Sequence, residues 1–349
     1  MTGPHPAVAA TRHAVREAID GSEFGSRLWV ACSGGPDSLA LAAAASFVGH
    51  KYGYLVGAIV VDHGLQEDSA RVAQAAAAQA RRAGIATVFV ETVTVGRDGG
   101  LEAAARAARY AAIEERVDAE GGRSPLILTG HTMDDQAETV LLALARGSGA
   151  RALAGIPPRR GRIVRPFLSL RRDVTVAACA AQHLEPWYDP TNEGEFGPRR
   201  SALRTTVMPA LVDVLGPGVV SGLARSAALL QADADELDRQ TRTALRVTAA
   251  SDDQWRCDQL ASLPDAIRSR LLKLLAESAG AAPLGATHVA ALTALVTQYK
   301  GQGAVSLPGG FEARREYGRL IIDRSLDEQG EFRRPRSGPT DTSDPGSSE

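Results

Sequence analysis

The feature that most constrains this chain is the hexapeptide Ser-Gly-Gly-Pro-Asp-Ser, which separates an apolar strand from an Ala/Leu-rich helix. A tight connection between a strand and a helix needs one glycine and one capping residue, and this stretch has more than that. Paired glycines leave backbone N–H groups free to surround an anion, and the following helix directs its positive N-terminus to the same place. The sequence therefore predicts a phosphate-binding loop formed by Ser33, Gly34, Gly35, Pro36, Asp37 and Ser38.

Asp37 adds a second constraint, because a carboxylate repels a bound phosphate unless a cation lies between them. No lysine follows the two glycines, so this is not the nucleotide-binding loop that ends in Gly-Lys-Ser/Thr. Carboxylate oxygens beside a polyphosphate are typical of a magnesium site. We therefore expect Asp37 to bind Mg²⁺.

Apolar runs and helical patterns alternate through the first 150 residues. Strands are expected at 27–31, 55–61, 87–95 and 126–129, and helices at 38–48, 69–83, 101–120 and 134–146, the last with Asp134 as its cap. This alternation predicts an α/β fold with a parallel sheet. Ligands bind at the carboxyl ends of the strands in such sheets, so the loop at 33–38, the stretch at 60–65 and Gly130-His131 are expected on one edge.

The pattern changes after about residue 150. A segment rich in Pro and Arg is followed by a long helical pattern from 219 to 246, two more at 265–277 and 287–299, and short strands around 308–310 and 318. We expect a catalytic domain at 1–215 and a smaller, mainly helical domain at 216–325. The polar residues 326–349 are expected to form a disordered tail.

Composition restricts the compartment and the kinds of site. The three cysteines lie far apart and form no CxxC pair, which suits a reducing compartment and argues against a disulfide framework, a structural zinc or an iron–sulfur cluster. No stretch reaches the roughly 18 apolar residues of a membrane span. We expect a soluble, cytoplasmic protein that has no membrane partner.

A second group of polar residues follows the fourth expected strand. Asp135 and Glu138 are three residues apart, so both carboxylates lie on the first turn of the helix that follows Gly130-His131. Acids in a first turn commonly do no more than complement the helix dipole. Beside the phosphate loop, however, Asp135 and Asp37 are expected to hold Mg²⁺ together. His131 is expected either to face the developing charge or to position the nucleotide.

The hexapeptide fits the SGGxDS signature of the PP-loop ATP pyrophosphatases. GHTMDDQAETVLLALARGSG at 130–149 resembles one family among them, the tRNA(Ile)-lysidine synthases. Further blocks resemble that family at 60–65, 105–110, 165–172, 187–192 and 199–209, although Val60 stands where the family's motif begins with His. Residues 216–323 resemble the family's central helical domain, including the blocks at 306–310 and 314–322. Longer members carry an additional C-terminal domain, so the resemblance implies a short form.

The resemblance implies a ligase that joins L-lysine to C2 of the cytidine at the first anticodon position of tRNA(Ile) with a CAU anticodon. ATP first adenylates the C2 oxygen and pyrophosphate leaves, and the lysine amine then displaces AMP, which changes codon reading from AUG to AUA. The implied nucleotide contacts include Val61 and Gly130. The implied catalytic residues are Asp37, Arg109, His131 and Asp135, with Asp135 either a metal ligand or a base.

The tRNA needs a basic platform, and the segment from Arg146 to Arg204 holds 11 arginines, no lysine and 5 acids. Arginine forks suit phosphate contacts, and we expect Arg199, Arg200 and Arg204 to bind RNA. The closest alternative is another PP-loop tRNA-modifying enzyme, such as a tRNA thiolase, which would need a sulfur-handling cysteine pair. A nucleotide-binding module without catalysis would need neither the acids beside His131 nor the arginine-rich segment.

Overall fold

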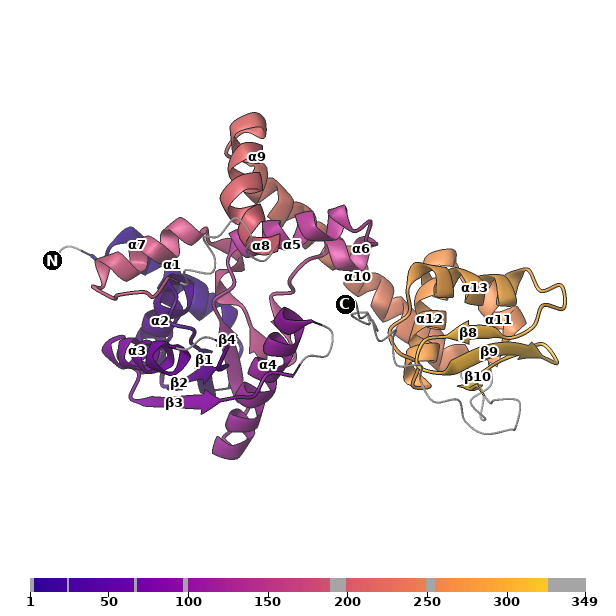
Figure 1. Ribbon diagram of the computed structural model, residues 1–349, viewed down its shortest axis with the longest axis horizontal. Coiled ribbons are helices and arrows are strands. Elements are labelled where there is room, and N and C mark those ends of the chain that lie inside the picture. The colour runs from indigo at the N-terminus through magenta and orange to yellow at the C-terminus, as the bar shows by residue number, and fades with distance from the viewer. Residues whose placement is uncertain are drawn as a thin grey trace, which may run out of the picture. The chain divides into compact units, whose positions relative to one another are not determined.

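The computed structural model describes residues 3–23, 25–65, 68–96, 100–188, 199–248 and 255–325. They divide into two compact units, Met1–Gln231 and Ala232–Glu349, and the division lies inside helix α10 (Val219–Thr248) (Figure 1). The sequence-based boundary at 215/216 stays a prediction, and the expected tail at 326–349 lies outside the described residues.

The first unit is built on a six-stranded sheet with the order β3-β2-β1-β4-β6-β5. The strands are β1 (Arg27–Ala31), β2 (Leu55–Asp62), β3 (Thr87–Thr92), β4 (Leu126–Thr129), β5 (Arg159–Arg160) and β6 (Ile163–Val164). All neighbours pair in parallel except β5, which is antiparallel to β6. The predicted parallel α/β sheet is therefore confirmed. The β5–β6 hairpin was not predicted, because two-residue strands in an arginine-rich segment show no alternating pattern.

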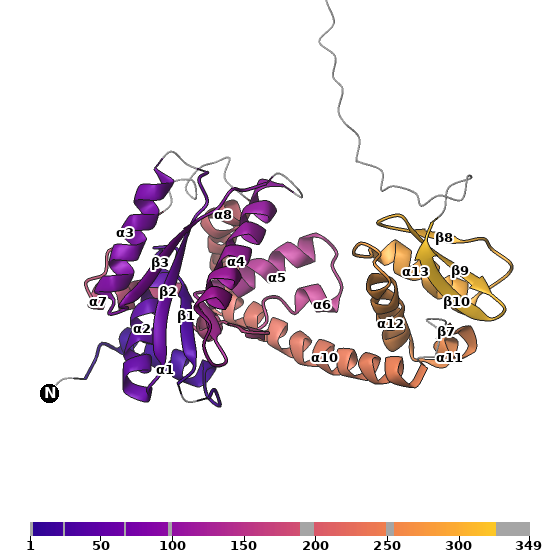
Figure 2. The same ribbon diagram turned by 90° about the horizontal axis from the view of Figure 1, so that it is seen from below.

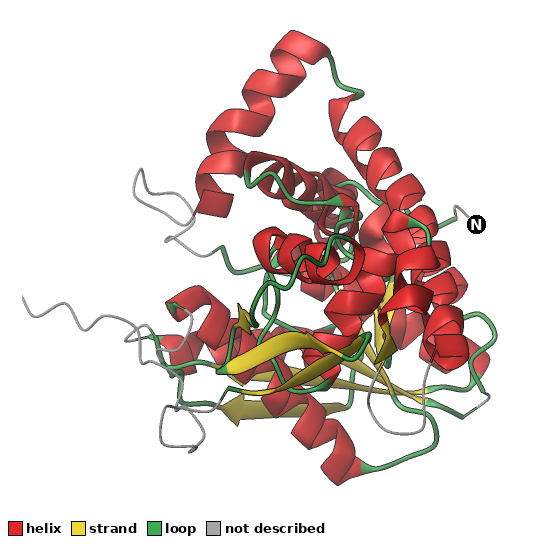
Figure 3. Ribbon diagram, turned by 90° about the vertical axis from the view of Figure 1, so that its right-hand side faces the viewer, coloured by secondary structure: helices red, strands yellow, loops and turns green. Residues whose placement is uncertain are grey.

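Helices cover both faces of this sheet. They are α1 (Pro6–Ala18), α2 (Pro36–Tyr52), α3 (Ser69–Arg82), α4 (Leu101–Glu120), α5 (Met133–Ala145), α6 (Ala150–Leu153), η1 (Pro166–Ser169), α7 (Arg172–Ala181), α8 (Arg199–Ala202), the π-helical η3 (Leu203–Val207) and α9 (Met208–Leu215). Figure 2 shows α3 and α4 on opposite sides of strands β1–β3. Helices account for most of the regular structure (Figure 3).

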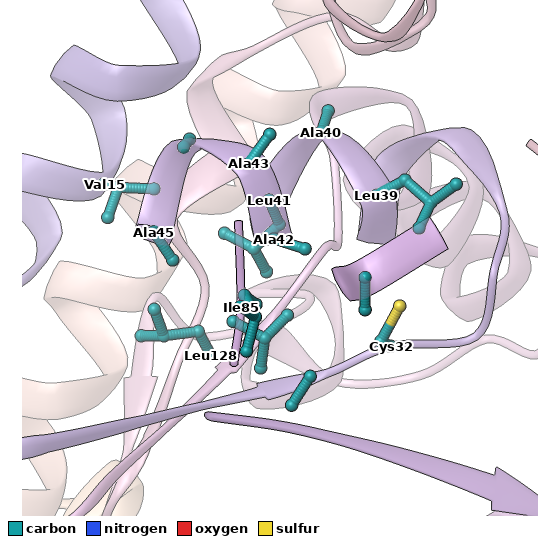
Figure 4. Packing of buried hydrophobic residues seen from close by; sticks show 14 of the residues in the cluster. Val15, Cys32, Leu39, Ala40, Leu41, Ala42, Ala43, Ala45, Ile85 and Leu128 are labelled. Carbon is teal, nitrogen blue, oxygen red and sulfur yellow. The ribbon is translucent and has the colours of Figure 1, made fainter. Parts of the chain in front are cut away.

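Strand β1 shows how one short strand serves two cores. Leu28 and Val30 belong to the larger apolar cluster, and Trp29 between them belongs to the cluster on the other face. Helix α2 packs into the larger cluster, where Leu39 and Leu41 are fully buried (Figure 4). A helix that is apolar on all sides has to be buried on all sides, and so α2 lies inside the unit with its N-terminus at the end of β1. This burial fixes the phosphate loop that joins the two elements.

The second unit combines helices with a small antiparallel sheet. Helices α11 (Cys257–Ser262), α12 (Asp265–Ser278) and α13 (Ala286–Thr297) pack with a sheet of order β7-β10-β9-β8. Its strands are β7 (Trp255–Arg256), β8 (Val305–Leu307), β9 (Phe311–Glu316) and β10 (Arg319–Arg324). The predicted smaller, mainly helical domain and the short strands at its end are confirmed.

In the part of the chain that the structure describes, no single helix is both long and apolar enough to span a membrane, and one sharply bent pair, Arg200–Leu215 with Val219–Thr248, meets the criteria of length and composition.

Candidate active site

The loop at 33–38 is held in shape by its own side chains and by two close approaches. Gly34 has φ +83°, and a Cβ there would lie 2.8 Å from the Cβ of Ala76, so only glycine fits. The hydroxyl of Ser38 accepts a hydrogen bond from the Ser33 N–H (3.2 Å) and donates one to the Gly35 carbonyl (3.0 Å). Ser38 therefore closes the loop.

The N-terminus of α2 is open to a ligand. Its N-cap is Gly35, which has no side chain. The N–H groups of the first turn therefore have no hydrogen bond to a capping side chain, the partner that such groups usually have. A Cβ on Gly35 would meet nothing closer than 3.8 Å, so the packing of the chain does not itself require glycine here. Space and unpaired N–H groups at a helix N-terminus are the requirements of an anion site.

Gly130 brings the second group of residues to this loop. A Cβ there would lie 3.0 Å from the backbone carbon and oxygen of Asp37, so the end of β4 packs directly on the first turn of α2. The three stretches expected on one edge of the sheet do share a cavity of about 650 Å³. Among the sequence-predicted residues, those that line it are Ser33, Gly35, Pro36, Asp37, Ser38, Val61, Arg109, Gly130, His131, Asp135 and Arg204.

Three of the predicted residues lie elsewhere or outside the description. Gly34 does not line the cavity and instead packs on α3 through Ala76. Arg200 lies on α8, and its guanidinium donates to the hydroxyl of Thr139 at 3.5 Å. The side chain of Arg199 lies outside the described residues.

The centre of the site is Arg172, which begins α7 and which the sequence analysis did not single out. Its guanidinium bonds to Asp37 (Nε to Oδ2, 3.1 Å), Asp135 (Nη2 to Oδ1, 2.7 Å) and Glu138 (Nη1 to Oε1, 3.5 Å). One cation thus joins the phosphate loop to the first turns of α5. Thr175, one turn further along α7, donates a short hydrogen bond to the other oxygen of Asp37.

Arg204 supplies a second guanidinium to the same carboxylates. It bonds to Glu138 (Nε to Oε1, 2.8 Å) and contacts Asp135 (Nη2 to Oδ1, 3.4 Å). Glu138 is only 2% exposed, so its charge needs these partners. Arg204 lies in the π-helical turn η3, a local distortion that occurs often at functional sites. Its contacts favour a role at the carboxylates rather than on RNA.

The cap of α5 differs from the expected one. Thr132 is the N-cap, and Asp135 completes a capping box by accepting from the Thr132 N–H and hydroxyl, both at 2.8 Å. Asp134 instead binds the Arg171 guanidinium and the Arg172 N–H (2.8 Å), which fixes the start of α7. The ordinary capping role of Asp135 therefore occupies one of its oxygens, and the other faces Arg172.

Burial and charge shift the pKa values of two carboxylates that line the cavity, Asp37 and Asp135, in opposite directions. Burial raises the pKa of Asp37, and the contacts with Arg172 and Thr175 offset this only in part. Burial also acts to raise the pKa of Asp135, but Arg172 and the hydrogen bonds from Thr132 outweigh it, so that pKa lies below its usual value. Paired groups whose pKa values are pushed apart are typical of acid–base sites. Asp37 is the better proton acceptor of the two, and Asp135 is the more firmly ionised.

Carboxylate oxygens suit Mg²⁺, which proteins commonly bind through one or two carboxylates together with substrate phosphates. Within the described ranges, no group of three or more His, Cys, Asp or Glu side chains is arranged to hold a metal ion by itself. Asp37 and Asp135 nevertheless converge on one guanidinium, and therefore on one position beside the phosphate loop. Asp37 and Asp135 could therefore bind an ion that also binds a polyphosphate. When no such ion is bound, Arg172 is the cation that balances the two carboxylates.

The opposite wall of the cavity is basic. Arg106 and Arg109 project from α4 beside His131, and burial lowers the pKa of Arg109. The Nδ1 of His131 lies 2.9 Å from the hydroxyl of Thr129. Burial lowers the pKa of His131 to about 4, and nearby arginines lower it further against the opposing charge of Asp135. His131 is therefore neutral at physiological pH and acts as a hydrogen-bonding group rather than a cation.

Replacing His131 by asparagine should reduce the acid sensitivity of the fold. The folded pKa of about 4 lies below that of a free histidine, so between pH 6.5 and 4 only the unfolded chain binds this proton, and stability falls as pH falls. The cost at pH 5 is at most about 2 kcal/mol. Urea unfolding at pH 7 and pH 5 measures it: wild type should lose more stability than His131→Asn. Equal losses in the two proteins would contradict a neutral, buried His131. Replacing the exposed His13 by asparagine is the control.

Family comparisons agree with this geometry. A model described as a PP-loop domain matches residues 10–211, and one described as a TilS substrate binding domain matches residues 256–321. A tRNA(Ile)-lysidine synthase from Thermobifida fusca is 48% identical over 324 residues, which cover 92% of this chain and 99% of the relative. The chain belongs to the tRNA(Ile)-lysidine synthase family.

Other lysidine synthases are similarly related. The enzyme from Salinispora tropica is 50% identical over 327 residues, 92% of this chain and 97% of its own length. The enzyme from Mycobacterium tuberculosis is 43% identical over 290 residues, 82% and 86% of the two chains. The resemblance predicted from the sequence motifs is confirmed, and the PP-loop domain makes this family member an ATP-binding protein.

Lysidine synthase motifs led to most of the residues of this site, but they gave no role to Arg172, and Thr175 lies outside them. Both belong to the start of α7. Arg172 ends the family-like block at 165–172 and was also counted among the 11 arginines of the basic segment, but no role was predicted for it. The available signal was the adjacent pair Arg171-Arg172 at the end of the block at 165–172, in a segment where no helix was expected. Nothing in the chain order says that this pair returns to the phosphate loop.

Proposed function

We propose that the chain is a cytoplasmic ligase that joins L-lysine to C2 of the cytidine at the first anticodon position of tRNA(Ile) with a CAU anticodon, at the expense of ATP. The observation that supports this most is the convergence of Asp37, Asp135 and Glu138 on Arg172, beside an uncapped helix N-terminus. In such a site the helix N-terminus can bind a polyphosphate, and the carboxylates can accept the proton that a nucleophile releases. We assign catalysis to 1–215, and tRNA binding to 216–325 together with Arg199 and Arg200 of the catalytic domain.

The phosphates of ATP are proposed to lie at the first turn of α2. Its N–H groups and helix dipole favour negative charge, and they become most valuable as pyrophosphate leaves. Arg109 faces the same cavity from α4 and is proposed to bind the leaving pyrophosphate. Val61 at the end of β2 and Gly130 at the end of β4 are proposed to border the nucleoside.

Asp37 and Asp135 are the residues that would hold Mg²⁺ in this site. When bound, the ion would neutralise charge on the phosphates that are transferred and released. Holding it requires that Arg172 release at least part of its contacts with these two carboxylates.

The second half of the reaction needs a neutral lysine amine. The amine nitrogen forms a bond to C2, the C2–O bond to AMP breaks, and one proton has to leave the nitrogen. Burial makes Asp37 the more basic carboxylate, and Asp135 is ionised and also faces the cavity. Either carboxylate can accept the proton, and neutral His131 can hydrogen-bond to the cytidine or the nucleotide.

Arg199 and Arg200 are proposed to bind tRNA phosphates. Replacing both by alanine should weaken tRNA binding and reduce the slope of log affinity against log salt by about 2, because fewer counterions leave the RNA when two fewer phosphates are neutralised. ATP affinity should change little, since Arg200 does not line the cavity. Filter binding at several salt concentrations, with ATP binding measured alongside, separates the two effects. A collapse of ATP binding with an unchanged salt slope would move these arginines to the ATP site.

A tRNA thiolase is the alternative within the superfamily, and the cysteines disfavour it. Cys32, Cys179 and Cys257 are all buried free thiols, and burial raises the pKa of each. A sulfur carrier needs an accessible, readily ionised thiol.

Pyrophosphate release tests the proposal directly. With ATP and tRNA(Ile) carrying the CAU anticodon, the enzyme should release pyrophosphate, and with tRNA omitted it should release little. The same tRNA with uridine in place of the target cytidine is the matched control. Equal release from both tRNAs would contradict adenylation at this base.

A further inference from the structure

The turn between β9 and β10 carries an aromatic residue that the fold does not use. Tyr317 has φ +48° and the next residue, Gly318, has φ +77°, so two consecutive residues are left-handed. Two-residue hairpin turns of this kind favour Asn-Gly, because asparagine and glycine tolerate positive φ. A bulky residue in the first of these positions is a conformational outlier.

Packing of the Tyr317 ring does not offset this backbone strain. The residue is 102% exposed, so it buries no more surface than an extended peptide would. Asparagine would form the same turn with less strain, and therefore local folding gives no reason for tyrosine. Strained and exposed residues of this kind point to a role in binding.

The surroundings of Tyr317 are aromatic and basic. Tyr299, which is 42% exposed, donates a hydrogen bond to the Arg315 carbonyl (3.4 Å), and the Arg315 guanidinium lies 4.9 Å from the Tyr299 ring centre. The exposed Lys300 follows Tyr299, and Arg319 begins β10 immediately after the turn. We call this group the aromatic corner: Tyr299, Lys300, Arg315, Tyr317 and Arg319.

The nearby acids do not cancel its charge. Three acids, Glu312, Glu316 and Asp323, share the guanidinium of Arg314, and Asp258 pairs with Arg256. Arg256 itself lies directly opposite Arg319 in the β7–β10 pair, so two cations share one edge of the sheet. The described cations around the turn outnumber the acids by two, six against four: Arg256, Lys300, Arg314, Arg315, Arg319 and Arg324 against Asp258, Glu312, Glu316 and Asp323.

We propose that the aromatic corner binds unpaired RNA, with the ring of Tyr317 stacked on an exposed base and Lys300, Arg315 and Arg319 near the flanking phosphates. Exposed aromatic rings interleaved with cations are how proteins hold unstacked bases. This inference rests on the proposed function, because it takes the RNA to be the tRNA substrate.

The experiment compares Tyr317→Asn with Tyr317→Phe in the full chain. Asparagine suits the turn and removes the ring, so its melting temperature should equal or exceed that of wild type, while affinity for the tRNA(Ile) transcript should fall about tenfold or more. Phenylalanine keeps the ring, so its affinity should stay within about twofold of wild type. Val247→Asn removes another exposed apolar side chain of the same unit and is the matched control.

Fluorescence anisotropy of labelled tRNA, without ATP or lysine, gives these affinities independently of catalysis. Unchanged binding by Tyr317→Asn, or an equal loss in Tyr317→Phe, would overturn the inference. Failure of the proposed function has a different signature, which is a wild-type enzyme that makes no lysidine. The two outcomes are read from different samples and cannot be confused.

Discussion

Replacing Arg172 by methionine is expected to abolish pyrophosphate release and to destabilise the first unit. The guanidinium is the common partner of Asp37, Asp135 and Glu138. Its removal leaves their negative charges close together, and among the described side chains Arg204 then pairs with Asp135 and Glu138 but not with Asp37. Removing one partner from a buried ion cluster costs about 3–5 kcal/mol. Lysine should not restore activity, because a single ammonium cannot reach three carboxylates in the way that a planar fork does.

The pH dependence distinguishes this account from simple misfolding. Without Arg172, burial and mutual repulsion should raise the folded pKa values of the carboxylates above their unfolded values. The folded chain then binds more protons, so the stability gap between Arg172→Met and wild type should narrow as pH falls from 7 to 5. Urea unfolding at both pH values measures it. A gap that widens on acidification would contradict the cluster. Arg171→Met, which removes only the ion pair with Asp134, is the control.

Replacing Asp37 by asparagine should lower pyrophosphate release by about 10²- to 10³-fold, the usual loss when one preorganised electrostatic group is removed. The fold should survive, because the amide is isosteric and burial already disfavours the Asp37 charge. Thermal unfolding and pyrophosphate release on the same sample give both quantities. Asp173→Asn, an exposed acid on the same helix as Arg172, should change neither. Release at the wild-type rate from Asp37→Asn would remove this carboxylate from the chemistry.

The sequence predicted the phosphate loop and the Asp135 helix of this site, but not the arginines that bind their carboxylates. The phosphate loop and the Asp135 helix were predictable because each directly follows a strand, and parallel strands end on one edge of a sheet. Gly130 shows why they meet so closely, since its missing Cβ lets β4 pack on the backbone of Asp37. That close approach depends on tertiary packing, and no periodicity reveals it.

Arg172 was not predictable for a similar reason. It bonds to a residue 135 positions earlier in the chain, and a basic segment does not show which of its arginines turns inward. Arg204 was expected on RNA for its charge alone, whereas the π-helical turn that directs it to Glu138 is a structural feature. Tyr317 lay in a correctly expected strand region, but its left-handed conformation appears only in the folded hairpin.

The central claim is that this site attaches lysine to a cytidine of tRNA, and the mass of that nucleoside tests it most directly. The enzyme would be incubated with ATP, L-lysine and tRNA(Ile) carrying the CAU anticodon, and the tRNA would then be digested to nucleosides for mass spectrometry. The account predicts that the first anticodon cytidine gains the mass of lysine less one water, only when ATP and lysine are both present. An unchanged cytidine, or one that carries sulfur instead, would contradict it.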